Sequence, residues 1–318
     1  MNKIKKIILL LLFSVSTFAQ SNVEVNSLTR PILNGHKFIV NNYVKSPFVN
    51  THLRNTLGFG QAMDLIVPIE INGEQLVGLR GDISFLTLDF AYQFQINKWL
   101  AFFSDVGMIT RFGTETQSLI AQGLNASYGV ELGWLFNVLT TKNVSVSLTA
   151  NLWKRSGTVI NLLDFVKEII DSSGLPSESN LVYSRDYLQG GGGIRTAWAI
   201  NKYFGLNASL ELAYGEAIDN VMKNDLYYRF GVSGDFDLNS KYKGVPIGIS
   251  AGLLLDSFTL SNDNAVDDKS VLFFIRTSYT AENDMLISLD LTWTRLPMNY
   301  AQENLNTVSS LITLEYFF

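Results

Sequence analysis

Hydrophobic and polar residues alternate one by one in many stretches between residue 52 and the C-terminus. Clear examples span residues 86–94, 128–138, 204–214, 271–278 and 285–293. In the first of them, Leu86, Leu88 and Phe90 are separated by Thr87 and Asp89. Successive side chains of a β-strand point to opposite faces, so a period of two predicts strands with one apolar and one polar face.

The alternating stretches predict about twelve strands, by the spacing of strand and turn signals: one near 52–62, five hairpins, and a last one over 309–318. Short turns are expected near residues 97–98, 140–143, 201–202, 239–244 and 281–284. Longer polar connections are expected near 63–81, 113–125, 156–185, 215–225, 259–269 and 297–307. An even number of strands places both ends of the barrel domain on the side of the short turns. Short turns at one end and long loops at the other are typical of outer-membrane β-barrels.

The predicted fold class is therefore all-β: a transmembrane antiparallel up-and-down barrel with a short helix in an outer loop. Every backbone N–H and C=O inside hydrocarbon must be paired, and a sheet achieves this only by closing on itself. A secreted β-sandwich is the soluble alternative, but its outward faces would carry Lys and Glu. The faces predicted to point outward here carry almost no charge.

The N-terminus has the three parts of a secretory signal peptide, which we assign to residues 1–19. Lys3, Lys5 and Lys6 form a basic start, residues 7–13 are apolar, and small residues precede a cleavage position after Ala19. Residues 20–50 then precede the first strand and contain several apolar side chains. They are expected to form either a plug inside the lumen or an extended periplasmic tail. Residues 51–318 form the predicted barrel.

The last strand carries a recognisable pattern in which Ile312, Leu314, Tyr316 and Phe318 alternate and Phe318 ends the chain. This resembles the C-terminal strand signal of Gram-negative outer-membrane proteins, of a type common in Bacteroidota. The resemblance implies location in the cell outer membrane, with the lipid bilayer and the barrel-assembly machinery as partners. It says nothing about a solute.

Composition narrows the function. Charged residues make up 17% of the chain, below the roughly 25% of ordinary soluble domains. The absence of Cys excludes a disulfide scaffold, a zinc–thiolate site and an iron–sulfur cluster. Loss of the three lysines in residues 1–19 changes the net charge from −5 to −8. That balance argues against nucleic acid or an anionic membrane surface as a partner.

Charges of both signs fall on the polar faces that are predicted to line the lumen. Asp89 and Asp105 are equidistant from the turn at Asn97, so they are expected to be cross-strand neighbours. Glu131 should lie slightly higher on the next strand and complete an acidic wall. The predicted lumen charges are Arg54, Asp89, Asp105, Arg111, Glu131, Arg195, Glu211, Arg229, Asp235, Asp256, Arg276, Asp290 and Glu315.

The lumen charges are also expected to form pairs. Arg54 and Arg111 are candidate partners for the acidic wall, and Arg54 should also meet Glu315 where the first and last strands join. Two further expected pairs across neighbouring strands are Glu211 with Arg229 and Arg276 with Asp290. These charges either fill and rigidify the lumen as structural ion pairs or form a constriction whose field orients a polar solute.

An outer loop is predicted to contain a helix over residues 160–171. Its apolar stripe needs a covering surface, which is either another outer loop, such as one holding Leu119 and Ile120, or the barrel mouth, where it would act as a lid. A run of four glycines at residues 190–193 is predicted to mark a bend, room for a bulky neighbour, or a wider lumen. The lid candidates are Leu162, Leu163, Phe165, Val166, Ile169 and Ile170.

Candidate catalytic chemistry is sparse. Some outer-membrane barrels are phospholipases that use Ser and His on the barrel wall, but His36 and His52 are the two histidines here and neither is expected beside an outer-leaflet Ser. The loop over 262–268 lacks the Gly and Glu spacing of a calcium loop. We therefore predict no enzyme, cofactor or metal site. The predicted function is a passive channel for small solutes, and the alternative is a closed structural or partner-binding barrel.

Overall fold

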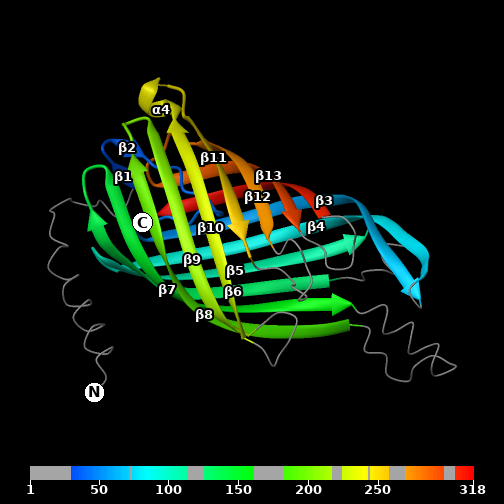
Figure 1. Ribbon diagram of the computed structural model, residues 1–318. Coiled ribbons are helices and arrows are strands. Elements are labelled where there is room, and N and C mark those ends of the chain that lie inside the picture. The colour runs from blue at the N-terminus through cyan, green and yellow to red at the C-terminus, as the bar shows by residue number, and fades with distance from the viewer. Residues whose placement is uncertain are drawn as a thin grey trace, which may run out of the picture.

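The chain forms a closed barrel of twelve antiparallel strands, β3 to β14, as the alternating pattern predicts (Figure 1). The computed structural model describes residues 30–71, 74–113, 125–160, 182–216, 224–242, 244–257, 269–296 and 305–318. Each barrel strand pairs with its neighbours in sequence, and β14 closes the barrel by pairing with β3. In chain order the elements are β1 (Ile32–Leu33), β2 (His36–Lys37), β3 (His52–Ile71), β4 (Glu74–Asn97), β5 (Leu100–Gly113), β6 (Asn125–Thr140), β7 (Val144–Ile160), β8 (Val182–Ala199), β9 (Phe204–Glu216), β10 (Asn224–Asp237), α4 (Leu238–Lys241), β11 (Ile247–Asp256), β12 (Ser270–Tyr279), β13 (Met285–Leu296) and β14 (Leu305–Phe317).

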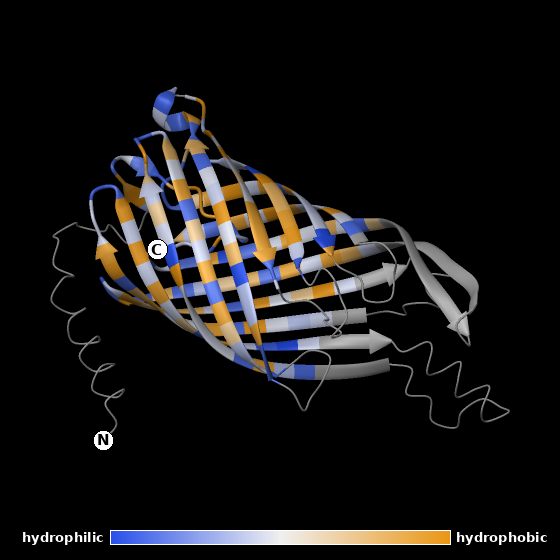
Figure 2. Ribbon diagram, viewed as in Figure 1, coloured by the Kyte–Doolittle hydropathy of each residue, from blue (hydrophilic) through white to orange (hydrophobic). Residues whose placement is uncertain are grey.

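Many apolar side chains of the strands are exposed on the outside, while many polar ones are buried inside the barrel. Hydrophilic and hydrophobic residues accordingly alternate along the strands (Figure 2). On β14, Ile312 is 58% exposed while the next residue, Thr313, is 1% exposed. On β9, Leu210 and Leu212 are exposed while Glu211 is buried. A continuous apolar outer surface of this size is stable in lipid rather than in water. Among the described helical residues, none belongs to a helix long and apolar enough to cross a membrane.

The predicted short connections all lie at one end of the barrel, together with the start of β3 and the end of β14 (Figure 1). One of them differs from the prediction, because residues 238–241 form the helix α4 instead of a simple turn. The Asp237 side chain accepts a hydrogen bond from the Asn239 backbone N–H and so caps this helix. We call this end of the barrel the turn end and the opposite end the loop end.

The connection predicted over 63–81 is wrong, since β3 continues to Ile71 and β4 begins at Glu74. Pro68 and the neighbouring acidic residues interrupt the alternation, which is why the sequence suggests a loop. Backbone pairing nevertheless continues up to Ile71 opposite Glu74, with irregular steps. Backbone pairing between β3 and β4 does not itself require an alternating hydropathy pattern, so it continues where that pattern stops. The dipeptide Asn72-Gly73 is a hairpin-turn signal that would have identified this hairpin.

The predicted loop helix cannot begin at Ile160, because that residue is the last of β7. Most of the other outer-loop and N-terminal predictions fall outside the described residues. These are residues 1–19, Leu119, Ile120, Leu162, Leu163, Phe165, Val166, Ile169, Ile170 and the loop 262–268.

The glycine run on β8 allows close approach of neighbouring backbones. A Cβ added to Gly191 would lie 2.1 Å from the carbonyl oxygen of Leu212, and one added to Gly193 would lie 2.3 Å from that of Leu210. Both carbonyls belong to β9. The adjacent strand therefore occupies the space that these glycines leave, which does not support the prediction of a wider lumen.

Candidate functional site

Residues 30–51, which precede the barrel in sequence, lie inside its lumen; we call them the lumen segment. The His36 Nε2 atom is 2.5 Å from the Asp235 Oδ1 atom of β10. The Asn42 side chain donates to Thr56 on β3 at 2.8 Å. The segment contains the short hairpin of β1 and β2, which the alternating pattern did not predict.

The lumen segment touches the whole circumference of the wall. Near its C-terminal end, the Gln93 side chain of β4 donates to the backbone oxygens of Phe48 and Asn50, both at 2.9 Å. Its residues bond to, share a hydrophobic cluster with, or lie close to inward-facing residues of all twelve strands. The bonded or clustered wall residues are Thr56, Gln93, Asp105, Leu135, Ser147, Ala197, Asp235, Arg276, Leu286 and Thr313, and the two glycines that the segment closely approaches are Gly205 and Gly248.

Apolar side chains of the lumen segment fill the space at the turn end. Phe38 and Ile39 are fully buried. The wall makes room for them with glycines: a Cβ on Gly248 would lie 2.3 Å from Ile39, and one on Gly205 would lie 2.6 Å from His36. The wall and the segment are therefore complementary in shape. Substitution of either glycine by a residue with a Cβ atom would displace the segment.

The lumen segment is also complementary to the wall in charge. It holds Arg30, His36, Lys37 and Lys45 but no Asp or Glu. Three of these four basic side chains face wall carboxylates: Arg30 faces Asp237, His36 faces Asp235, and Lys45 faces Asp105. Arg30 lies 4.0 Å from Asp237 and also donates to the Thr280 carbonyl oxygen at 3.0 Å. Burial lowers the pKa of Arg30, and the two aspartates near it oppose that effect.

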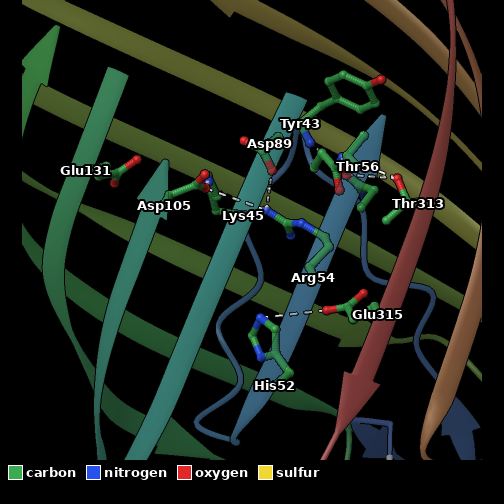
Figure 3. Close-up of polar contacts among 12 residues, drawn as sticks. Tyr43, Lys45, His52, Arg54, Thr56, Asp89, Asp105, Glu131, Thr313 and Glu315 are labelled. Carbon is green, nitrogen blue, oxygen red and sulfur yellow. Dashed lines mark hydrogen bonds and ion pairs between the residues drawn. The ribbon is translucent and has the colours of Figure 1, made fainter. Parts of the chain in front are cut away.

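The predicted acidic wall is present on β4, β5 and β6 (Figure 3). Asp105 faces Glu131 directly, so Glu131 is level with it and not higher as predicted. Asp89 faces Gly107, two residues from Asp105, so these two aspartates are diagonal neighbours and not directly opposed. The difference arises because Asn97 pairs with Leu100, which centres the turn beyond Asn97.

The cations around the acidic wall come from two sources. Arg54 on β3 lies 3.8 Å from Asp89 and 3.6 Å from Asp105, as the sequence predicted. Lys45 of the lumen segment bonds directly to Asp105, and this partner was not predicted. The Arg111 side chain, the other predicted partner, lies outside the described side chains.

Arg54 and Glu315 face each other across the closing strands, as predicted. Arg54 reaches the aspartates of the acidic wall instead of forming a close ion pair with Glu315. His52 Nε2 lies 3.6 Å from the Glu315 carboxylate. His52 also contacts the Asn50 side chain at 3.0 Å.

Other charges pair within the wall. Arg276 and Asp290 face each other as predicted, and the guanidinium grips the carboxylate with two bonds of 2.5 and 2.6 Å. The same Arg276 donates to the Val40 carbonyl oxygen of the lumen segment at 2.5 Å. Bidentate pairs of this kind fix geometry as well as charge. The structural interpretation of the lumen charges fits this pair.

Glu211 and Arg229 also face each other as predicted, but each has a closer partner. Arg229 lies 2.9 Å from Asp256, and Arg195 lies 2.7 Å from Glu211. The guanidinium of Arg229 also lies 5.7 Å from the ring centre of Trp153, a side chain that is 2% exposed. These pairs join neighbouring strands without any contribution from the lumen segment.

Little empty space remains where the lumen segment meets the acidic wall. A void of about 40 Å³ is lined there by Lys45, Arg54, Asp105 and Arg195, among others. This volume holds about one water molecule. Within the described part of the chain, no group of three or more His, Asp or Glu side chains is arranged to hold a metal ion.

Sequence reasoning missed Arg30, His36 and Lys45 because the segment before the first strand has no alternating pattern. A signal was nonetheless present. A stretch of 22 residues from Arg30 to Thr51 with basic residues and no acid stands out beside a barrel whose polar faces contain many carboxylates. Such complementarity indicates contact between the two, although it does not give the individual pairs.

Comparisons with known proteins identify the fold but no family. No family model and no curated protein matches the chain. A solved outer-membrane channel from Pseudomonas putida F1 matches with a TM-score of 0.51 and 9% identity, over 88% of this chain and 100% of that one. The NanC porin gives 0.48 and 8%, over 83% and 100%. A Pseudomonas aeruginosa FadL homologue gives 0.40 and 10%, over 95% and 99%. The chain is thus similar in fold to outer-membrane β-barrel channels.

Proposed function

We propose that the protein is an outer-membrane channel through which small solutes pass passively along a charged lumen. In this proposal residues 1–19 direct export, and the barrel-assembly machinery reads the alternating end of β14 with Phe318. The lumen segment is a plug that closes the channel in the present structure. Passage requires that the plug leave the lumen or move within it.

The observation that carries the proposal is the nature of the contact between the plug and the wall. A barrel of twelve strands encloses more space than a barrel of eight strands, in which the side chains of the wall can fill the interior by themselves. Here the wall does not fill its own interior, because residues 30–51 occupy it and glycines such as Gly205 and Gly248 accommodate them. A separate segment held by polar bonds is easier to displace than wall side chains.

The second candidate is a closed structural or partner-binding barrel. The buried bonds from Arg276 to Asp290 and to Val40 favour it, since they tie the plug to an ion pair of the wall. Enzyme function has less support. Both histidines are engaged in contacts between the plug and the wall or within the wall: His36 contacts Asp235, and His52 contacts Asn50 and Glu315.

Single-channel recording of refolded protein in planar bilayers tests the proposal. We expect the mature chain to conduct rarely or in short openings, and a variant without residues 20–50 to conduct steadily. Circular dichroism of the variant would first establish that its β-sheet content is intact. A folded barrel that passes no current in either form would contradict the channel and favour the closed barrel.

A further inference from the structure

The site that holds the Lys45 side chain differs from the sites of the other basic side chains of the plug, because it contains carboxylates from three adjacent strands. Its ammonium group bonds to Asp105. Glu131 lies opposite Asp105 and Asp89 lies diagonal to it, so three carboxylates line one patch of the wall on adjacent strands (Figure 3). One flexible side chain from outside the wall therefore occupies a receptor made by the wall.

At this receptor the carboxylates share the cations that the wall supplies. Arg54 faces both aspartates at 3.6 to 3.8 Å. Arg195 lies 3.9 Å from Glu131, but its closer partner is Glu211 at 2.7 Å. The two aspartates therefore share Arg54, while Glu131 accepts a hydrogen bond from the Asn151 side chain at 3.0 Å and shares Arg195 with Glu211. By contrast, Asp290 and Asp256 each have a close guanidinium on a neighbouring strand.

A small void, large enough for about one water molecule, lies beside the bound ammonium. The void of about 40 Å³ borders both Lys45 and Asp105. Their side chains keep 14% and 12% of their exposure, whereas Arg276 and Asp290 keep none. A charge pair that retains access to space and solvent exchanges partners more readily than a sealed one.

We infer that Asp105, with Asp89 and Glu131, forms a binding site for the ammonium group of cationic solutes, which Lys45 occupies from within the same chain. This inference rests on the proposed function for its role, because a solute would meet the site once the plug moves. The bound Lys45 side chain shows the kind of ligand that fits: a compact cation on an unbranched aliphatic stem. Such a solute competes with Lys45 and so favours the open state.

The experiment uses the full chain with Lys45→Met, which removes the ammonium and keeps an unbranched side chain. The probe is n-butylammonium, which reproduces the end of a lysine side chain, and n-butanol is its uncharged counterpart. The readout is the midpoint of thermal unfolding of refolded protein as the probe is titrated. We expect n-butylammonium to stabilise Lys45→Met at concentrations about fivefold to tenfold lower than those needed to stabilise the wild type equally. This ratio corresponds to a difference in binding free energy of about 1 kcal/mol. n-Butanol should not discriminate between them.

Two matched variants keep the test specific. Lys37→Met removes the same charge from the plug, but Lys37 bonds to the Asn283 side chain at the turn end, so it should respond like the wild type. Lys45→Met combined with Asp105→Asn should lose the added response. Equal responses of the wild type, Lys45→Met and the double variant would overturn the inference.

The inference and the proposed function can fail separately. Unfolding midpoints require no ion current, so an Asp105-dependent response in a barrel that never conducts would retain the site and reject the channel. Where the variant lacking residues 20–50 does conduct, n-butylammonium should block its current, and Asp105→Asn should weaken that block by about fivefold to tenfold. A steady current with no Asp105-dependent block would overturn the cation site and leave the channel.

Discussion

Two charge pairs of the lumen show how differently this barrel treats its wall and its plug. Arg276 and Asp290 are fully buried, lie on adjacent strands and are joined by two bonds. Lys45 and Asp105 are partly exposed, join the plug to the wall, and have Arg54 close by. The first pair is part of the barrel framework, and the second is a replaceable contact. Buried charge in a lumen can therefore serve stability at one position and exchange at another.

The largest effect is expected at the framework pair. Arg276→Met leaves Asp290 buried without its cation and removes the bond to Val40, so it should lower the free energy of unfolding by about 3–5 kcal/mol. Urea titration of refolded protein measures this. The double variant Arg276→Met with Asp290→Leu should recover much of the loss, because it removes the uncompensated charge. If Arg276→Met lowered the free energy of unfolding by less than Lys45→Met does, the distinction between the framework pair and the replaceable pair would be contradicted.

A smaller effect is expected from crowding the plug without changing any charge. Gly205→Ala puts a methyl group 2.6 Å from His36 and should cost about 1–3 kcal/mol. The matched control is Gly129→Ala, which faces the lumen away from the plug and meets Arg155 at an ordinary 3.7 Å. Gly205→Ala should also increase channel opening in bilayers. Equal effects of the two glycine variants would show that the plug does not pack tightly on β9.

The replaceable pair should contribute least. Lys45→Met is expected to lower the free energy of unfolding by about 1 kcal/mol, since Arg54 still faces Asp105. Lys37→Met should change it by less than about 0.5 kcal/mol, as expected for a solvent-facing side chain. The same urea titrations measure both. A loss of several kcal/mol from Lys45→Met would place Lys45 in the framework and remove the distinction between the two pairs.

The sequence predicted the parts of the structure that lipid constrains. Alternation in the segments that meet hydrocarbon revealed the twelve strands, the closed barrel, and the facing of Arg276 with Asp290. Outside the hydrocarbon that constraint disappears, and there the extension of β3 to Ile71 was mistaken for a loop. Small errors in the position of a turn shifted Asp89 relative to Asp105. The partners of Lys45 and His36 depend on how an irregular segment folds in three dimensions, which no local pattern records.

The most direct test of the account is to lock the plug in place. The chain has no Cys, so one designed pair can be studied without interference. A Cβ on Gly231 would lie 3.0 Å from the Val44 Cγ2 atom. A disulfide requires about 3 Å between one Cβ and the partner sulfur, as its bond length and angles dictate. Val44→Cys with Gly231→Cys should therefore form a bond between plug and wall.

Single-channel recording of this double variant before and after reduction measures the role of the plug. We predict silence in the oxidised form and openings that appear on adding reductant to the same membrane. Gly231→Cys alone should behave identically under both conditions. An oxidised, cross-linked protein that conducts as well as the reduced one would contradict the claim that residues 30–51 close the lumen.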